Sequence, residues 1–230
     1  MAISGSRVFA LAVLAAGSTI ARDDWPQWRG PQRDGALLSF IAPKSWPETM
    51  KRKWTVTLGE GHASPVLASG KIFVFTRQQS EEALTSIDPD SGKVLWRAAY
   101  PAPYKVNPAA DRHGAGPKST PVVYQGKVFT LGIGGVLSSF DAATGKPGWR
   151  KNFSGEFRET SPWYGTATSP VVDGGMVIAH VGGHDDGAWL SSPGRGRWSP
   201  KPSRTLSASR PRLGSCSGKF PLPPNSPRIR

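Results

Sequence analysis

Short apolar runs alternate with polar, glycine-containing turns between residues 64 and 187. Runs of this length, bounded by turn residues, predict β-strands rather than helices. The order of runs and turns repeats in three lines, which are 64–96, 120–149 and a third that starts at residue 169. The prolines that open them, Pro65, Pro121 and Pro170, are 56 and 49 residues apart. The pattern therefore predicts a repeat protein built from strands.

Each repeat unit has the same physical interpretation. Ser/Thr-Pro-Val opens a strand where proline removes no needed donor, and "SGK", "QGK" or "DGG" turns the chain into the next strand. A third strand ends at Asp-x-x-Ser/Thr-Gly-Lys, where Asp binds its own loop and Gly adopts a positive φ. A fourth strand then carries a Trp that is expected in the core between units. The structural residues of the two complete units are Asp88, Gly92, Trp96, Asp141, Gly145 and Trp149.

Four short strands at a period of about 50 residues are typical of one blade of a β-propeller. The expected fold class is all-β, a partial β-propeller of four-stranded blades, with about two to three blades in residues 22–187. A plain β-sandwich is the alternative, but it gives no reason for the Asp-to-Trp motif to repeat.

These motifs also resemble a known family. Asp-x-x-Ser/Thr-Gly-Lys-x-x-Trp, with Ser/Thr-Pro-Val upstream, resembles the repeat of pyrroloquinoline-quinone (PQQ)-like β-propellers. "DDWPQWRGPQRDG", "GAGPKSTPVV" and "VGGHDDGA" resemble an exported bacterial subgroup that is similar to BamB-type propellers. The resemblance covers about residues 23–187 and implies a ring of several blades. Because eight blades would need on the order of 400 residues, the ring is expected to be incomplete in this chain.

The formal net charge of +13 is concentrated at the C-terminal end. Residues 188–230 contain seven Arg, two Lys and no Asp or Glu, whereas residues 1–187 contain 20 basic and 16 acidic side chains. This Ser/Pro/Arg-rich segment cannot bury enough apolar area to offset its chain entropy, so we expect it to be disordered. A selected basic tail could bind nucleic acid or anionic lipid. An exported protein is not expected to meet nucleic acid, so no such partner is assigned.

An out-of-frame translation is the favoured interpretation of residues 188–230. Back-translation of Ala188–Trp198 allows a shifted frame to read Leu-Ala-Phe-Glu-Ser-Gly-Thr-Gly-Lys-Val, which has the form of the missing repeat turn. The same shift near the chain end allows a strand ending in Trp. Reading the coding DNA tests the hypothesis, because stop codons or the absence of a repeat in the shifted frame would refute it.

Residues 1–21 predict an export signal. Arg7 precedes the apolar run "VFALAVLAAG", which is too short to span a bilayer comfortably, and Ala21 ends a small-residue cleavage pattern. A buried strand or helix is the alternative. No Cys follows the run, so a lipid-anchored form is not expected. The sequence favours a periplasmic or extracellular protein with no transmembrane span in the mature chain.

Metal and cofactor sites receive little support from the sequence. The four His residues lack the spacing of zinc or calcium loops, and Cys216 is the only Cys. The resemblance includes quinoprotein dehydrogenases, which hold PQQ and Ca²⁺ near the propeller axis with a Trp floor and a vicinal Cys pair. Residues 1–187 contain no Cys, so no catalytic residue, cofactor site or metal site is assigned.

The stretch "WPQWRGPQRDG" is both aromatic and basic. Trp25, Trp28 and Arg29 are its candidate binding residues, and the stretch is expected either to pack against the blades or to present a binding face. The favoured function is a non-catalytic exported scaffold, similar to BamB-type propellers, that binds a protein or small-molecule ligand.

Two alternatives stay open. The chain could be a fragment of a PQQ-dependent alcohol or sugar dehydrogenase, which would be an enzyme that uses PQQ and Ca²⁺. It could also be a non-functional truncated product, because open strand edges in an incomplete ring predict aggregation.

Overall fold

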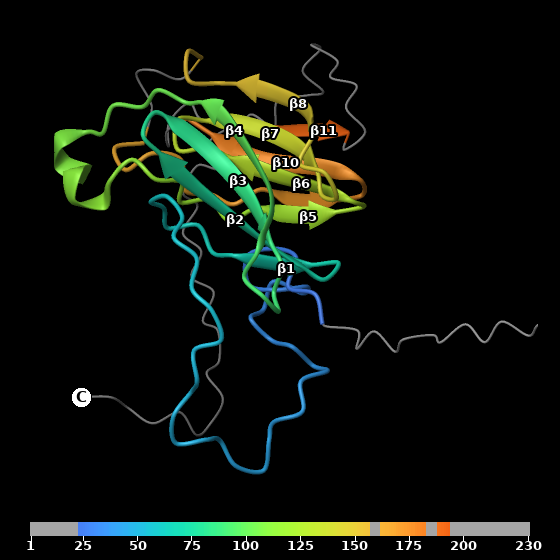
Figure 1. Cartoon of the computed structure of the whole chain (residues 1–230). Helices are drawn as coiled ribbons and strands as arrows, with labels where there is room; N and C mark the ends of the chain where they lie inside the picture. Colours follow the sequence, from blue (N-terminus) through green and yellow to red (C-terminus); the bar gives the residue numbers. More distant parts are fainter. Residues whose placement is uncertain (1–22, 157–161, 183–187, 194–230) are drawn as a thin grey trace, which may run out of the picture.

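The computed structural model describes residues 23–156, 162–182 and 188–193. These residues form three antiparallel sheets, each built from consecutive strands, together with one short 3-10 helix (Figure 1). The first sheet contains β1 (Val66–Ala68), β2 (Lys71–Gln78), β3 (Glu81–Ile87) and β4 (Val94–Pro101). The second contains β5 (Val122–Tyr124), β6 (Lys127–Leu131), β7 (Val136–Asp141) and β8 (Pro147–Asn152), and the helix η1 (Pro108–His113) precedes it. The third contains β9 (Val171–Asp173), β10 (Met176–Val181) and β11 (Ala188–Pro193).

Within each sheet, every strand pairs with the strand that precedes it in the sequence. The strand orders are β1-β2-β3-β4, β5-β6-β7-β8 and β9-β10-β11. The two complete sheets use the same register, because Val66 pairs with Phe73 in the first and Val122 pairs with Phe129 in the second. This arrangement confirms the prediction of an all-β chain built from propeller blades.

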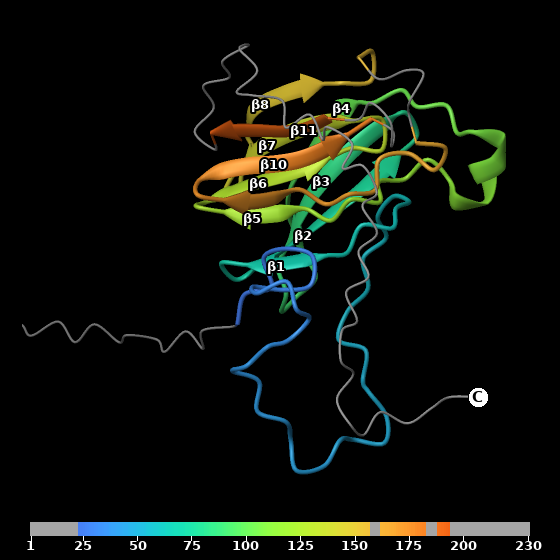
Figure 2. The ribbon, with the colours of Figure 1, turned by 180° about the vertical axis from the view of Figure 1, so that it is seen from behind.

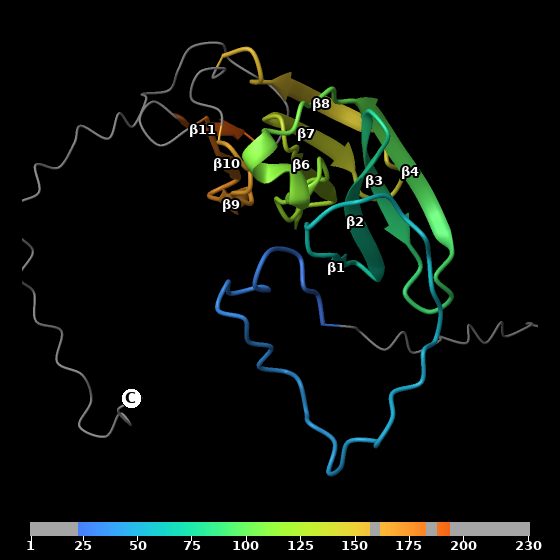
Figure 3. The ribbon, with the colours of Figure 1, turned by 90° about the vertical axis from the view of Figure 1, so that its left-hand side faces the viewer.

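The short first strands of the sheets lie next to one another. β1 contacts β5, and β5 contacts β9. From this inner edge the sheets spread outward, and β4 and β8 form the outer edges of the first two (Figures 2 and 3). This is the geometry of propeller blades arranged around an axis, with β1, β5 and β9 nearest to it.

The hydrophobic core lies between adjacent sheets rather than inside any one of them. The layer between the first and second sheets joins Phe73, Phe75 and Leu84 to Val128 and Phe140. The layer between the second and third sheets contains Phe129, Leu131, Leu137, Val177 and Ala179. Since each blade buries its faces against its neighbours, one blade by itself would leave most of this area exposed.

The two repeat turns have nearly identical hydrogen bonds. Asp88 Oδ1 accepts from the backbone N–H and the hydroxyl of Ser91, both at 2.7 Å. Asp141 Oδ1 accepts from the N–H and the hydroxyl of Thr144, at 2.9 and 2.8 Å. An Asp followed three residues later by Ser or Thr therefore fixes the loop locally, before any contact with another blade.

A Trp of one unit lies on the turn glycine of the next. A Cβ added to Gly92 would come within 2.7 Å of the Trp54 ring, and one added to Gly145 within 2.6 Å of the Trp96 ring. Both glycines have positive φ, 73° and 74°. These positions therefore require glycine both for the backbone conformation and for the close approach of an indole.

Replacing Asp88 and Asp141 together with Asn is expected to lower stability at neutral pH, with a deficit that shrinks in acid. The Ser91 and Thr144 hydroxyls and nearby N–H groups hold the pKa of the two carboxyls below their ordinary value of 3.8. Such a carboxyl contributes stability that is complete above its unfolded pKa and is lost as the pH falls through its folded pKa. Urea unfolding from neutral pH down to about pH 2 measures this, and a deficit that stays constant with pH would contradict it.

The C-terminal segment differs in part from the prediction of a disordered tail over residues 188–230. The six residues Ala188–Pro193 form β11, which pairs antiparallel with β10 from Val181 to Met176. The physical reason is that the free edge of β10 offers backbone donors and acceptors to any extended chain, and Pro appears only at the end of this segment. Residues 1–22, which include the predicted export signal, and residues 194–230 lie outside the described residues.

Candidate functional site

The N-terminal segment Trp25–Arg33 crosses the inner strands of all three sheets. Trp25 forms a two-bond bridge with Leu67 of β1, at 2.7 and 3.0 Å. The Val123 N–H of β5 donates to the Pro26 carbonyl at 2.8 Å, and Arg33 Nη2 donates to the Val172 carbonyl of β9 at 3.3 Å. The segment thus holds together strands that are more than a hundred residues apart in the sequence.

The three candidate binding residues of this segment occupy different environments. The partly buried Trp25 ring covers Gly30, where an added Cβ would come within 2.7 Å of it. Trp28 is 53% exposed, and the Arg29 guanidinium lies 5.6 Å from its ring centroid. Trp25 therefore packs within the N-terminal segment, whereas Trp28 and Arg29 are exposed and their predicted role in binding stays a prediction.

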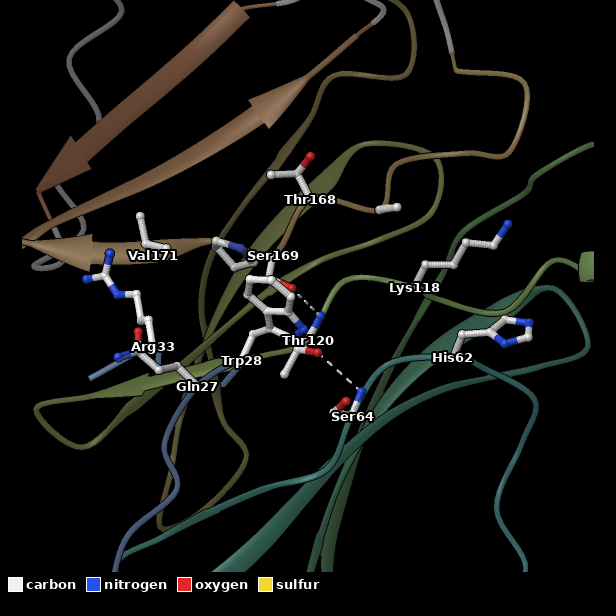
Figure 4. A pocket seen from close by; sticks show the side chains of 12 residues that line it. Gln27, Trp28, Arg33, His62, Ser64, Lys118, Thr120, Thr168, Ser169 and Val171 are labelled. Atoms are coloured by element: carbon white, nitrogen blue, oxygen red, sulfur yellow. Dashed lines mark hydrogen bonds between the residues drawn. The ribbon is translucent and has the colours of Figure 1, made fainter. Parts of the chain in front are cut away.

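A cavity of about 470 Å³ lies where this segment meets the starts of the inner strands (Figure 4). Its lining comes from four separate stretches, one in the N-terminal segment and one before each of β1, β5 and β9. The lining residues are Gln27, Trp28, Arg33, His62, Ser64, Lys118, Thr120, Ala167, Thr168, Ser169, Pro170 and Val171.

The lining of this cavity combines two cationic side chains and one indole with polar and apolar residues. Arg33 and Lys118 are the charged side chains among the described lining residues, which include no Asp or Glu. Lys118 Nζ donates to the Tyr164 carbonyl at 2.6 Å, and partial burial lowers the pKa of this amine from its ordinary value. His62 Nε2 lies 3.0 Å from the His113 carbonyl. With Trp28 at its edge, the cavity suits a group that carries negative charge next to a flat or apolar part.

A ladder of hydroxyl groups runs along the wall of the cavity from blade to blade. The Ser64 N–H donates to Thr120 Oγ1 at 3.2 Å, and the Thr120 N–H donates to Ser169 Oγ at 2.9 Å (Figure 4). These three residues are the Ser/Thr of the repeated Ser/Thr-Pro-Val motif. The motif therefore does more than start a strand, because its hydroxyl joins each blade to the preceding one.

Thr120→Val is expected to destabilise the protein by about 1–3 kcal/mol, since it removes the acceptor for the Ser64 N–H while preserving side-chain shape. Hydrogen exchange should become faster at the Ser64 amide in this variant. Thr120→Ser retains the hydroxyl and is the control. Equal exchange at Ser64 in the Val and Ser variants would show that the ladder does not protect this amide.

A buried polar cluster joins the first blade to the second. Glu82 on β3 is fully buried, and its carboxylate accepts from the Tyr100 hydroxyl at 2.7 Å and from the Ile133 N–H at 2.8 Å. Burial raises the pKa of the Glu82 carboxyl above its ordinary value, although these two hydrogen bonds oppose the rise. Burial and the nearby Glu82 carboxylate raise the pKa of the Tyr100 phenol well above its ordinary value.

Arg77 balances the charge of Glu82 at this joint. Its Nη2 lies 3.7 Å from Glu82 Oε1 and donates to the Ala102 carbonyl at 2.7 Å, and its Nε donates to the Ala115 carbonyl at 2.6 Å. Arg150 of the second blade stacks over the Tyr100 ring, with 3.9 Å between the guanidinium carbon and the ring centroid. Sequence reasoning missed this cluster, because its residues come from four strands and no local motif contains them.

The described residues do not supply a Ca²⁺–PQQ site of the kind that the resemblance implies for dehydrogenases. No group of three or more potential metal-ligating side chains occurs in the part of the chain that the structure describes. The cavity at the starts of the inner strands, here called the axial cavity, offers Trp28 and two cations that could contact a quinone carboxylate. Its described lining contains no carboxylate for Ca²⁺. No reaction step through this cofactor is therefore derived.

The sequence matches the family described as "Outer membrane protein assembly factor BamB" over residues 15–113 and 80–212. The chain belongs to this family. The second matched range continues past residue 187 into the segment interpreted as out of frame, and that interpretation stays a prediction. Among curated proteins, none matches the sequence significantly.

Several solved structures are similar to this BamB-family chain over part of their length. A europium-containing methanol dehydrogenase is 16% identical over 61% of this chain and 24% of its own, with a TM-score of 0.44. The quinohemoprotein alcohol dehydrogenase from Comamonas testosteroni is 24% identical over 59% of this chain and 19% of its own, at a TM-score of 0.42. BamB from Moraxella catarrhalis is 17% identical over 63% of this chain and 36% of its own, at 0.40. This chain thus spans about a fifth to a third of the length of these proteins.

No helix in the described part of the chain is long and apolar enough to cross a membrane. The first 22 residues are outside that part, so the export signal remains a prediction from sequence.

Proposed function

We propose that the chain is an exported, non-catalytic binding module whose axial cavity holds an acidic segment of a partner protein. The observation that supports this most directly is the composition of the cavity. Two cations, on opposite sides, and an exposed indole line it (Figure 4), and none of its described lining residues is a carboxylate. Such a site attracts carboxylates through charge and contacts the rest of a peptide through the indole face.

The hydrogen bonds made by the polar side chains of the cavity also favour binding over catalysis. Its polar side chains are engaged with the backbone, as with Lys118 on the Tyr164 carbonyl and Arg33 on the Val172 carbonyl. A general base or nucleophile would need a neighbour that activates it. Here the hydroxyls of Thr120 and Ser169 accept backbone N–H bonds and so serve the ladder between blades.

Titration with a hexaglutamate peptide, followed by tryptophan fluorescence or calorimetry, tests the proposal. Hexaglutamate is expected to bind and hexalysine is not. The double variant Arg33→Gln/Lys118→Gln should weaken hexaglutamate binding at least about tenfold, since two charge-assisted contacts are lost. Lys93→Gln/Lys146→Gln is the matched control, because it removes the same charge from two exposed repeat turns outside the cavity. Equal binding by both double variants would show that any attraction is due to net charge alone.

The rival reading, a fragment of a PQQ-dependent dehydrogenase, is tested on the same protein. Reconstitution with PQQ and Ca²⁺ should give no alcohol- or sugar-dependent reduction of an electron-accepting dye. Turnover that depends on both PQQ and Ca²⁺ would overturn the non-catalytic assignment.

A further inference from the structure

The third sheet presents an open outer edge. β3 and β7, the third strands of the first two sheets, each have an outer neighbour, β4 or β8. The corresponding strand β11 is last in its sheet, and no fourth strand follows it in the described part of the chain. Its outer row of backbone donors and acceptors therefore faces away from β10 and pairs with no strand of the described residues, so it could accept another extended chain.

An extended segment elsewhere in the chain has the pattern of a fourth strand. In residues 51–58, here called the orphan segment, Trp54, Val56 and Leu58 are partly buried and the residues between them are exposed. β4 alternates in the same way, with Trp96 at least half-buried and Tyr100 fully buried four residues later. Among the described residues, backbone hydrogen bonds of this region begin only at Glu60, after the orphan segment has ended.

The orphan segment also contacts the first blade as a fourth strand contacts the next blade. Trp54 Nε1 donates to the Pro89 carbonyl at 3.0 Å, and Trp96 Nε1 donates to the Ala142 carbonyl at 3.3 Å. Each acceptor directly follows the Asp of a repeat turn, and each indole lies on the glycine of that turn. Trp54 is therefore the fourth-strand Trp of a blade that would precede the first one.

The residues before Trp54 continue this match. Trp46–Trp54 reads "WPETMKRKW", beside "DPDSGKVLW" for Asp88–Trp96. Pro, an acid, Ser or Thr, Lys and Trp take the same places, whereas Trp46 and Met50 replace the Asp and the Gly. Trp46 is 60% exposed and Met50 76% exposed, and this stretch runs well away from the three sheets (Figures 1 and 3). It shares part of the repeat-turn sequence without the Asp and the Gly that fix such a turn, and among the described residues it has no neighbouring blade to cover.

The second blade has the complementary feature, a fourth-strand Trp whose indole N–H lacks an acceptor in the described part of the chain. Trp149 is the fourth-strand Trp of the second blade, and its buried Nε1 has no hydrogen-bond partner among the residues that the structure describes. The equivalent atoms of Trp54 and Trp96 both donate to a turn carbonyl. A turn carbonyl from outside the described residues is therefore needed here, since an unpaired buried N–H costs about 1–3 kcal/mol.

We propose that a second copy of this chain completes the third blade, with its orphan segment pairing antiparallel to β11. The register follows from the complete blades. Phe73, Phe129 and Ile178 are each the third residue of a second strand, and they pair with Ser86, Ser139 and Ser191. Ser86 faces Trp96 and Ser139 faces Trp149 on the fourth strands. Ser191 is therefore placed opposite Trp54 of the second copy, and Leu190 opposite Thr55.

This pairing gives the turn-like stretch of the second copy a place to bind. The carbonyls that accept from Trp54 and Trp96 lie seven residues before the next Trp in the sequence. Counted in the same way, Pro47 of the second copy would present its carbonyl to Trp149 Nε1. Two copies that each supply a fourth strand to the other would form a two-fold symmetric dimer.

Disulfide trapping between two single-cysteine variants tests the register directly. Thr55→Cys and Leu190→Cys are made separately in the full chain with Cys216→Ser, mixed, and oxidised. The expected product is a disulfide-linked dimer that contains one chain of each variant, because only pairing between copies brings these positions together. Thr57→Cys mixed with Leu190→Cys is the control, displaced by two residues, and should give at least about fivefold less linked dimer since a disulfide needs Cα atoms within about 7 Å.

Sedimentation velocity of the unmodified full chain supplies the second readout. A dimer that grows at the expense of monomer as the concentration rises is expected. Monomer at all concentrations, equal trapping in the control pair, or a ladder of larger species in place of a dimer would each overturn the proposal. The monomer result would also assign the edge of β11 to another occupant, such as residues 194–230 of the same chain.

Discussion

Glu82→Ala is expected to destabilise the protein by about 3–5 kcal/mol, because it leaves a buried arginine without its counter-charge. Arg77 is 3% exposed and keeps its carbonyl acceptors in the variant, but it loses the carboxylate 3.7 Å away. The Tyr100 hydroxyl and the Ile133 N–H lose their acceptor at the same time. Since typical domains are stable by about 5–15 kcal/mol, this change should shift the urea midpoint strongly and could unfold the chain.

The neighbouring Glu81 provides a matched control. It lies 3.5 Å from Arg97 in an exposed ion pair, so Glu81→Ala should cost at most about 1 kcal/mol. Chemical denaturation of both variants measures the contrast. If the two variants were equally stable, the inter-blade role of Glu82 would be wrong.

The isosteric variant Glu82→Gln separates charge from hydrogen bonding through its pH dependence. Burial raises the folded pKa of the Glu82 carboxyl above its ordinary value of 4.5. The ionised carboxylate is therefore costly in the folded state, and that cost disappears as the pH falls from the folded pKa toward the unfolded one. The stability of the wild-type chain relative to Glu82→Gln should thus rise as the pH is lowered through this window.

Gly145→Ala is expected to cost about 3–4 kcal/mol, more than the backbone conformation alone explains. The residue has φ 74°, which costs an L-residue about 1–2 kcal/mol. The added Cβ would also lie 2.6 Å from Trp96 Cε3, so the indole must move. Moving it disturbs the Trp96 contact with Phe73 and the bond from Nε1 to the Ala142 carbonyl.

Gly126→Ala isolates the conformational part of that cost. Gly126 has a similar φ of 71°, but an added Cβ meets nothing within 4 Å. Its substitution should cost only about 1–2 kcal/mol. Urea unfolding gives the free energy of unfolding of both variants, and the difference between them measures the cost of moving Trp96. Equal losses of stability would mean that the Trp96 ring moves without a free-energy cost.

The sequence predicted the blades because their signals are local. The Asp-to-Trp motif fixes a turn through hydrogen bonds that span three residues, as at Asp88 and Ser91. Each strand is likewise set by a short apolar run between two turns, so periodicity and turn chemistry were sufficient. Little stable structure was expected after residue 187, and Ala188–Pro193 are an exception because composition says nothing about a neighbouring strand edge.

The candidate site was only partly predictable. Of the three residues named from the aromatic and basic stretch, only Trp28 lines the cavity. Nothing local indicates that Arg33, His62 and Lys118 line it as well. Those residues come together because inner strands from different blades meet near the axis. A signal was available for the ladder, since Ser64, Thr120 and Ser169 occupy one position of the repeat.

The amino-acid sequence by itself determined the strands, the repeat turns, the family and the positions that require glycine. Each of these depends on interactions between residues that are close along the chain. The tertiary structure decided which blade face meets which, where the cavity lies, and that Glu82 is buried while the Glu81 side chain is 45% exposed. It also decided that Trp54 donates to the repeat turn of the first blade and that Trp149 Nε1 has no acceptor among the described residues. Both facts depend on contacts between units far apart in sequence.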